Sequence, residues 1–208
     1  YFVNKDTLAF LIADVSGKGI PAAMFMMNAK AVLKSYAESG LDVNKVFTLG
    51  NEKLCEGNDA GMFVTAWMGF LNTETGEVTF SNAGHNPPLV RHADGSFEYL
   101  KVRAGFVLAG MEGVKYRKNE LQLAPGDVIY LYTDGVTEAT NINDELYGED
   151  RLLALLNANK EASMEELCKL VKEDVFAFAG EAPQFDDITM LALKYCGATA
   201  PTNQEEAL

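Results

Sequence analysis

The stretch TLAFLIADVSGKGIPAA, residues 7–23, places an apolar run, an aspartate, a glycine-rich turn and a helix start in direct succession. Residues 7–13 are typical of a strand that buries its side chains. Pro21 suits the first turn of a helix, which we expect to extend to Glu38. Asp14 therefore lies at the tip of a buried strand, where its carboxylate meets the rim of a hydrophobic core.

Two other strand-like segments also carry aspartate at one end. VIYLYTD reaches Asp134, and DDITMLAL begins with the pair Asp186-Asp187. Asp14 and Asp134 are each followed by a glycine-rich turn, in which the backbone can approach a ligand closely. Clustered carboxylates repel one another unless a cation neutralises them, and hard oxygen ligands favour Mg²⁺ or Mn²⁺. The three segments together predict a divalent-metal site and hydrolytic chemistry.

Composition indicates a single soluble domain. The 208 residues are 48% hydrophobic and 23% charged, and no apolar run approaches the roughly 20 residues of a membrane span. A net charge of −13 opposes binding to nucleic acid or anionic lipid. Three scattered cysteines, Cys55, Cys168 and Cys196, do not form a disulfide framework, so we expect a cytoplasmic protein.

The order of the segments predicts helices before and after a block of antiparallel strands. A second helix is expected from an Asp42 cap to Gly57. The next four segments predict an antiparallel meander at 62–71, 77–83, 87–92 and 97–101. The remainder predicts a strand pair at 116–123 and 127–133, a helix at 150–159, a helix that begins at a Ser163–Glu166 capping box, and a strand at 188–195. This order implies an α+β layered domain with helix pairs packed on sheet faces.

Six segments together resemble a known family, the metal-dependent serine/threonine phosphatases of the PPM superfamily, in the bacterial branch typified by SpoIIE and RsbU. The segments are ADVSGKGIPAA (13–23), FVT (63–65), NAGHNPPL (82–89), PGDVIYLYTDGVTEA (125–139), YGEDRL (147–152) and DDITML (186–191). Their order and spacing extend over nearly the whole chain. The resemblance implies a four-layer α-β-β-α sandwich of antiparallel sheets with helix pairs on the outer faces. It assigns residues 1–196 to the phosphatase domain and leaves 197–208, which are polar, as a disordered tail.

The resemblance also implies a site for two ions, Mn²⁺ or Mg²⁺, between the sheets. Asp14 would bridge the ions, and the carbonyl of Val15 would bind one of them. Asp134 and Asp186 would hold the other ion. Asp187 is either a further ligand or a group that supports one. The catalytic residues implied in this way are Asp14, Asp134 and Asp186.

The implied activity is hydrolysis of phosphoserine or phosphothreonine on a regulatory protein of the anti-anti-sigma-factor type. Two adjacent divalent ions lower the pKa of a bridging water, which then attacks phosphorus without a protein nucleophile. The alternative is a phosphatase-like regulatory module that binds a partner without turnover. The resemblance further implies an upstream sensor domain and is compatible with a homodimer.

Two departures from the family pattern affect these expectations. The family carries a further aspartate in a Gly-Gly-Asp-aromatic-Asp segment, which would lie upstream of Tyr1. Because the chain begins with Tyr1 rather than Met, we expect that sequence precedes it, that the domain lacks its N-terminal strand or strands here, and that one metal site is incomplete. Residues 105–110 replace the Gly-x-Pro-Leu-Gly loop of related chains. His85 is interpreted as a turn residue hydrogen-bonded to backbone, with proton donation to the leaving group as the alternative.

Overall fold

The computed structural model describes residues 1–93, 95–184 and 186–198, which form two antiparallel sheets stacked face to face. The first sheet contains, in spatial order, β1 (Phe2–Asn4), β2 (Thr7–Val15), β3 (Val64–Asn72), β4 (Glu77–Ala83) and β7 (Asn119–Gln122). The second contains β6 (Phe97–Tyr99), β5 (Leu89–Arg91), β8 (Val128–Tyr132) and β9 (Met190–Lys194).

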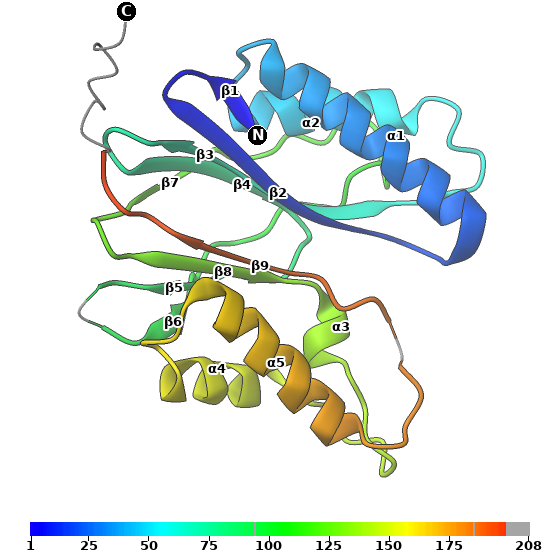
Figure 1. The fold of residues 1–208 in the computed structure, drawn as a ribbon. Helices are drawn as coiled ribbons and strands as arrows, with labels where there is room; N and C mark the ends of the chain where they lie inside the picture. Colours follow the sequence, from blue (N-terminus) through cyan, green and yellow to red (C-terminus); the bar gives the residue numbers. More distant parts are fainter. Residues whose placement is uncertain (94, 185, 199–208) are drawn as a thin grey trace, which may run out of the picture.

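Helices cover the outer face of each sheet (Figure 1). The first sheet carries α1 (Gly19–Glu38) and α2 (Val43–Cys55), and the second carries α4 (Glu149–Ala158) and α5 (Met164–Ala179). A short helix, α3 (Asp134–Thr137), follows β8 directly. The expected α+β fold, a four-layer sandwich with helix pairs outside, is therefore confirmed. Among the described residues, no helix has the length and apolar character that crossing a membrane requires.

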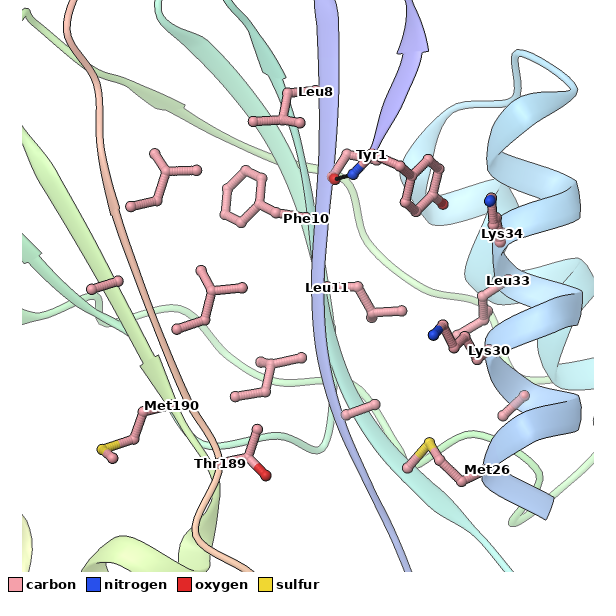
Figure 2. A pocket seen from close by; sticks show the side chains of 17 residues that line it. Tyr1, Leu8, Phe10, Leu11, Met26, Lys30, Leu33, Lys34, Thr189 and Met190 are labelled. Carbon is pink, nitrogen blue, oxygen red and sulfur yellow. Dashed lines mark hydrogen bonds between the residues drawn. The ribbon is translucent and has the colours of Figure 1, made fainter. Parts of the chain in front are cut away.

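The alternation of side chains along β2 separates two of the hydrophobic cores. Phe10 and Ile12 pack between the sheets with Trp67 of β3 and Leu131 of β8. Leu11 and its neighbours at odd-numbered positions pack on the other face, against α1 and α2. Figure 2 shows Phe10 and Leu11 on opposite sides of the strand. Successive side chains point to opposite faces of a sheet, so Asp14 continues the face of Phe10 and Ile12.

The predicted single meander is wrong, because the chain changes sheets after β4. Strands β3 and β4 pair with each other, whereas β5 and β6 pair in the second sheet. The change occurs at Gly84, whose φ of +71° suits glycine, and at Pro87-Pro88, which have no backbone N–H to donate to a ladder. The turn that the sequence marks is therefore a connection between layers.

The predicted strand pair on either side of Pro125-Gly126-Asp127 is also wrong. Strand β7 pairs with β4 in the first sheet, and β8 pairs with β5 and β9 in the second. The burial of the two strands gives the reason. All five residues of β8 are buried, which suits a central strand, whereas β7 alternates between half-buried and exposed residues, which suits an edge.

Of the two helix N-caps predicted from the sequence, one is present and the other makes different contacts. The capping box is confirmed: the Glu166 N–H donates to Ser163 Oγ at 3.2 Å, and the Ser163 N–H donates to Glu166 Oε2 at 3.1 Å. Asp42 occupies the N-cap position of α2, but its side chain makes no capping hydrogen bond. Its carboxylate lies 3.7 Å from Lys45 Nζ and 3.8 Å from Lys118 Nζ instead. Of the expected tail, 199–208 lie outside the described residues.

Candidate metal centre

Asp14 lies at the mouth of the space between the sheets. Its partner across the β2–β3 ladder is Thr65. Beyond Asp14 the chain turns through Gly17 into α1, and a cleft of about 620 Å³ opens there. The lining of this cleft includes Asp14, Val15, Asp186 and Asp187. The alternation along β2 and the turn at Gly17 thus place Asp14 in the same cleft as Asp186 and Asp187, which precede β9 of the second sheet.

Thr133 holds the acids of the second sheet in place. It immediately precedes Asp134, and its N–H donates to the Thr189 carbonyl at 3.0 Å. Its Oγ1 donates to the Asp187 carbonyl at 3.0 Å and accepts from the Thr189 N–H, also at 3.0 Å. One buried hydroxyl therefore joins the start of α3 to the segment that carries Asp186 and Asp187.

Gly135 allows the same two segments to approach closely. A Cβ atom at this position would lie 2.3 Å from the Asp187 carbonyl oxygen and 2.9 Å from its carbonyl carbon. Neither atom belongs to a side chain that could move away, so a larger residue would displace the segment. From the sequence, Gly135 was interpreted only as part of a turn in which the backbone can approach a ligand, and its role in packing was missed. The TDG sequence that follows a buried strand is the signal that could have indicated it.

The carboxylates of Asp14, Asp134 and Asp186 act on one another. Burial, together with the negative charges of Asp134 and Asp186, raises the pKa of Asp14 to about 6. Oδ1 of Asp134 is buried without a hydrogen-bond partner among the described residues. Oδ1 of Asp186 accepts from the Asp187 N–H at 2.8 Å. The fold therefore brings these three predicted acids together, whereas Asp187 lines the cleft without being among the charges that raise the pKa of Asp14.

The donor chemistry of this cleft fits a divalent cation. Within the described ranges, no three His, Cys, Asp or Glu side chains are grouped tightly enough to form a ready-made coordination shell. Asp14, Asp186 and Asp187 line the cleft, and Asp134 lies close enough for its charge to act on Asp14. A hard cation that prefers oxygen ligands would reduce the repulsion between these carboxylates and would give the unpartnered oxygen of Asp134 a partner. The residues present therefore fit Mg²⁺ or Mn²⁺.

His85 lies beside the cleft as a neutral, backbone-bonded turn residue. Its N–H donates to Asn82 Oδ1 at 2.8 Å, and its carbonyl accepts from Asn82 Nδ2 at 2.9 Å. Its Nδ1 lies 2.9 Å from Thr65 Oγ1. Burial lowers the pKa of His85 to about 4, so the ring is neutral at pH 7. The structure supports the interpretation as a turn residue over that of a proton donor.

A second, more voluminous cavity lies elsewhere and has a different character. It measures about 810 Å³ and runs between α1, β2 and β9 (Figure 2). Its lining is mostly apolar, with Tyr1, Lys30, Lys34 and Thr189 as the polar side chains. A cavity lined in this way offers no carboxylate to a cation. The smaller acidic cleft is therefore the better candidate for chemistry.

Comparison with known proteins shows the family of the chain. The family model described as stage II sporulation protein E (SpoIIE) matches residues 4–195. Protein IcfG of Synechocystis is 30% identical over 220 residues, which cover 93% of this chain and 34% of that protein. Phosphoserine phosphatase RsbU of Bacillus subtilis is 31% identical over 192 residues, which cover 92% of this chain and 56% of RsbU. The chain thus spans between a third and just over half of the length of these relatives.

A solved structure has the same fold. The crystal structure of the RsbU and RsbW domains of Rv1364c from Mycobacterium tuberculosis superimposes with a TM-score of 0.83 at 25% identity. The match covers 96% of this chain and 55% of that one. Because the match covers nearly the whole of this chain, the two proteins share the layered fold.

Proposed function

The chain belongs to the SpoIIE family, and from this premise we propose that it is a metal-dependent phosphatase of phosphoserine and phosphothreonine in proteins. One observation carries the proposal: Asp14 from one sheet and Asp186 from the segment before β9 line the same cleft, and Asp134 lies close enough that its charge, like that of Asp186, raises the pKa of Asp14. Acids held so close together serve no purpose in packing. They suit a cleft that binds cations.

We assign the following roles within this cleft. Asp14 and the Val15 carbonyl present oxygens from the first sheet, and Asp134 and Asp186 present them from the second. Asp187 is either a further ligand or a support for Asp186. Two bound ions of Mg²⁺ or Mn²⁺ supply a water of lowered pKa and neutralise phosphoryl oxygens. Thr133 and Gly135 keep the acids of the second sheet in register.

The neighbouring residues support attack by water rather than by a protein group. His85 is neutral at pH 7 and carries no positive charge to the phosphate, and its ring is buried with Nδ1 in contact with Thr65, which opposes nucleophilic attack by it. Burial raises the pKa of the Cys55 and Cys168 thiols, which opposes the thiolate that a cysteine phosphatase needs. The protein's contribution is therefore to hold oxygen ligands and exclude other nucleophiles.

The substrate class follows from the relatives. RsbU is named a phosphoserine phosphatase, and we propose that this chain also acts on a phosphorylated regulatory protein, of the anti-anti-sigma-factor type, in the cytoplasm. An upstream sensor domain would control it. The alternative is a phosphatase-like binding module without turnover. The retention of all three acids favours the enzyme, because a pure binding module has no need for them.

The deciding experiment measures phosphate release from a phosphoserine protein with Mn²⁺, with Mg²⁺ and with EDTA. We expect turnover with an ion and none with the chelator. The same samples are tested for retention of the phosphoprotein on the immobilised chain. Ion-dependent binding without phosphate release would replace the phosphatase by the binding module.

A further inference from the structure

Positive charge is concentrated in one short part of this acidic chain. Residues 101–118 contain five of its 17 Lys and Arg residues but only one of its 30 Asp and Glu residues. Three of the five cations, Arg103, Lys115 and Arg117, line a pocket of about 230 Å³. The pocket is separate from the acidic cleft and shares no lining residue with it.

The fold directs these three side chains to a common place. Tyr116 is buried, and its hydroxyl donates to the Val107 carbonyl at 3.2 Å, while Lys115 and Arg117 on either side of it are exposed. Arg103 reaches the same pocket from the segment that follows β6. That segment is fixed two residues later, where the Gly105 N–H donates to the Asn82 carbonyl at 2.8 Å. The arrangement is therefore built by backbone contacts rather than by chance proximity of long side chains.

The three cations have no anionic partner in the described part of the chain. Among residues 1–93, 95–184 and 186–198, no carboxylate lies within 4.0 Å of Arg103, Lys115 or Arg117, whereas the neighbouring Lys118 contacts both Asp42 and Glu120. Like charges around one cavity repel one another, and a bound anion relieves that repulsion. Guanidinium groups bind carboxylate and phosphate with paired hydrogen bonds. The pocket is therefore suited to an anionic group from outside the chain.

The pocket lies near the acidic cleft, at the same end of the first sheet. Asn82 lines the pocket and holds His85, which contacts Thr65 directly opposite Asp14. Asn82 on β4 pairs with Trp67, which pairs with Ile12, so Asn82 lies two strand spacings of about 4.8 Å across the sheet from β2 and about 7 Å along it from Asp14, or roughly 12 Å in all. An extended peptide covers that distance in about four residues. A phosphoserine in the cleft and a nearby acidic residue in the pocket can thus belong to one segment.

We propose that this pocket docks an aspartate or glutamate side chain that lies about three to five residues from the phosphoserine of a protein substrate. The proposal rests on the proposed phosphatase activity and extends it to substrate choice. Phe106 also lines the pocket and is 50% exposed, so it offers an apolar surface to the stem of a peptide side chain. On a surface of net charge −13, this pocket supplies the attraction that an acidic substrate segment needs.

The first test measures binding without turnover. A fluorescent hexaglutamate peptide and its hexaglutamine counterpart are titrated with the 208-residue chain in EDTA at low salt. We expect only hexaglutamate to bind. The double variant R103Q/R117Q should bind it at least tenfold more weakly, which corresponds to about 1.4 kcal/mol. The control K169Q/K172Q removes the same charge from α5, on the far layer, and should bind within twofold of wild type.

The second test measures substrate choice. Phosphoserine peptides with glutamate or glutamine four residues from the phosphoserine, on either side, are compared with p-nitrophenyl phosphate. We expect about tenfold higher kcat/KM for the better glutamate peptide, mainly through KM. The R103Q/R117Q variant should lose this preference and keep its activity on p-nitrophenyl phosphate.

The outcomes separate the two proposals. An unchanged preference in R103Q/R117Q, or equal losses in the α5 control, would overturn the docking pocket while leaving the phosphatase intact. Lack of any turnover by wild type would overturn the phosphatase, and hexaglutamate binding in EDTA would still decide the pocket. Preferential binding of a DNA duplex over hexaglutamate would assign the pocket to another ligand and overturn the proposal as well.

Discussion

Asp14, Asp134 and Asp186 illustrate residues whose positions oppose stability. Burial and the two neighbouring charges raise the pKa of Asp14 above that of a free carboxyl. Ionisation of Asp14 at pH 7 therefore costs more free energy in the folded protein than in the unfolded chain. In the absence of a cation, the cluster therefore weakens the fold. Residues retained at such a position point to a role in binding.

The first prediction concerns these acids one at a time. Asp14→Asn, Asp134→Asn and Asp186→Asn should each lower kcat/KM by about 10³-fold or more, or about 4 kcal/mol, because each removes an anionic oxygen ligand. The same changes should maintain or raise the Tm of the metal-free protein, because they relieve repulsion between carboxylates. Steady-state kinetics and thermal melts in EDTA measure both effects.

Asp187→Asn serves as the comparison, since Asp187 is not among the charges that act on Asp14. We expect a smaller loss of activity than for Asp186→Asn. Retained turnover in any two of the three acid variants would contradict the assignment of the site.

The second prediction concerns Asp127, a buried carboxylate whose role is structural. Burial alone would raise its pKa, but hydrogen bonds from the Ala124 and Ala93 N–H groups and from His92 outweigh burial and lower it. A lowered pKa stabilises the fold above the unfolded-state value near 4, and that stability is lost as the pH falls through the folded-state value. Asp127→Ala should lower the unfolding free energy by about 1–3 kcal/mol at pH 7.

Denaturant melts at pH 7 and pH 3 measure this effect. The difference between wild type and Asp127→Ala should be smaller at pH 3, which is below the unfolded-state pKa, because the stabilisation by the ionised carboxylate is lost progressively as the pH falls toward the folded-state pKa. An equal difference at both values would show that packing, and not the charge, accounts for it.

At the scale of elements, α3 is a short helix that organises the second half of the site. It was interpreted as a glycine-rich turn, yet Asp134–Thr137 are helical, and Gly135 within it packs against the Asp187 backbone. Burial of this glycine joins the end of β8 to the segment before β9. The spacing between Asp134 and Asp186 therefore depends on a contact between backbones.

The third prediction tests that contact. Gly135→Ala should displace the Asp186–Asp187 segment, because the new Cβ would lie 2.3 Å from a carbonyl oxygen that has no free space. We expect at least tenfold weaker Mn²⁺ binding and a corresponding loss of kcat/KM, with a circular dichroism spectrum like that of wild type. Calorimetric titration of Mn²⁺ measures the binding.

Thr133 provides the matched pair for this experiment. Thr133→Val removes both hydrogen bonds of the hydroxyl to the same segment and should reproduce the effect of Gly135→Ala, whereas Thr133→Ser keeps the hydroxyl and should retain binding. If Gly135→Ala, Thr133→Val and Thr133→Ser all kept the metal affinity of wild type, the segment would be positioned by other contacts.

For the whole molecule, the site joins two separate sheets. Asp14 belongs to the first sheet, and Asp134 and Asp186 follow or precede strands of the second. The sheets otherwise meet through apolar side chains such as Ile12, Trp67 and Leu131. A cation held by acids from both sheets would therefore connect the two halves of the sandwich at one end.

The fourth prediction follows from this arrangement. Mn²⁺ at 100 times its Kd should stabilise the whole domain by about 2.7 kcal/mol, since it binds the folded state, in which the two sheets bring the acids together. Asp14→Asn should abolish most of this stabilisation, and Lys172→Gln on α5 should leave it unchanged. Denaturant melts with and without Mn²⁺ measure it. A wild-type protein whose stability is insensitive to Mn²⁺ would contradict a site shared between the sheets.

Local patterns in the sequence determined most of the elements and the residues at their ends. Alternation along β2, the capping box of α5 and the glycine-rich turns act over a few residues, so they can be recognised without knowledge of the rest of the chain. The same is true of the three aspartates at strand ends. The resemblance to a family of phosphatases rested on these positions.

Only the tertiary structure decided which strands share a sheet and how the site is held together. β7 and β8 are neighbours in the sequence but lie in different layers, because the free energy of burying all of β8 depends on partners more than 30 residues away. The Gly135–Asp187 contact, the Thr133 hydrogen bonds and the cationic pocket likewise join distant segments. Contacts of this kind depend on packing between layers, which local sequence patterns do not specify.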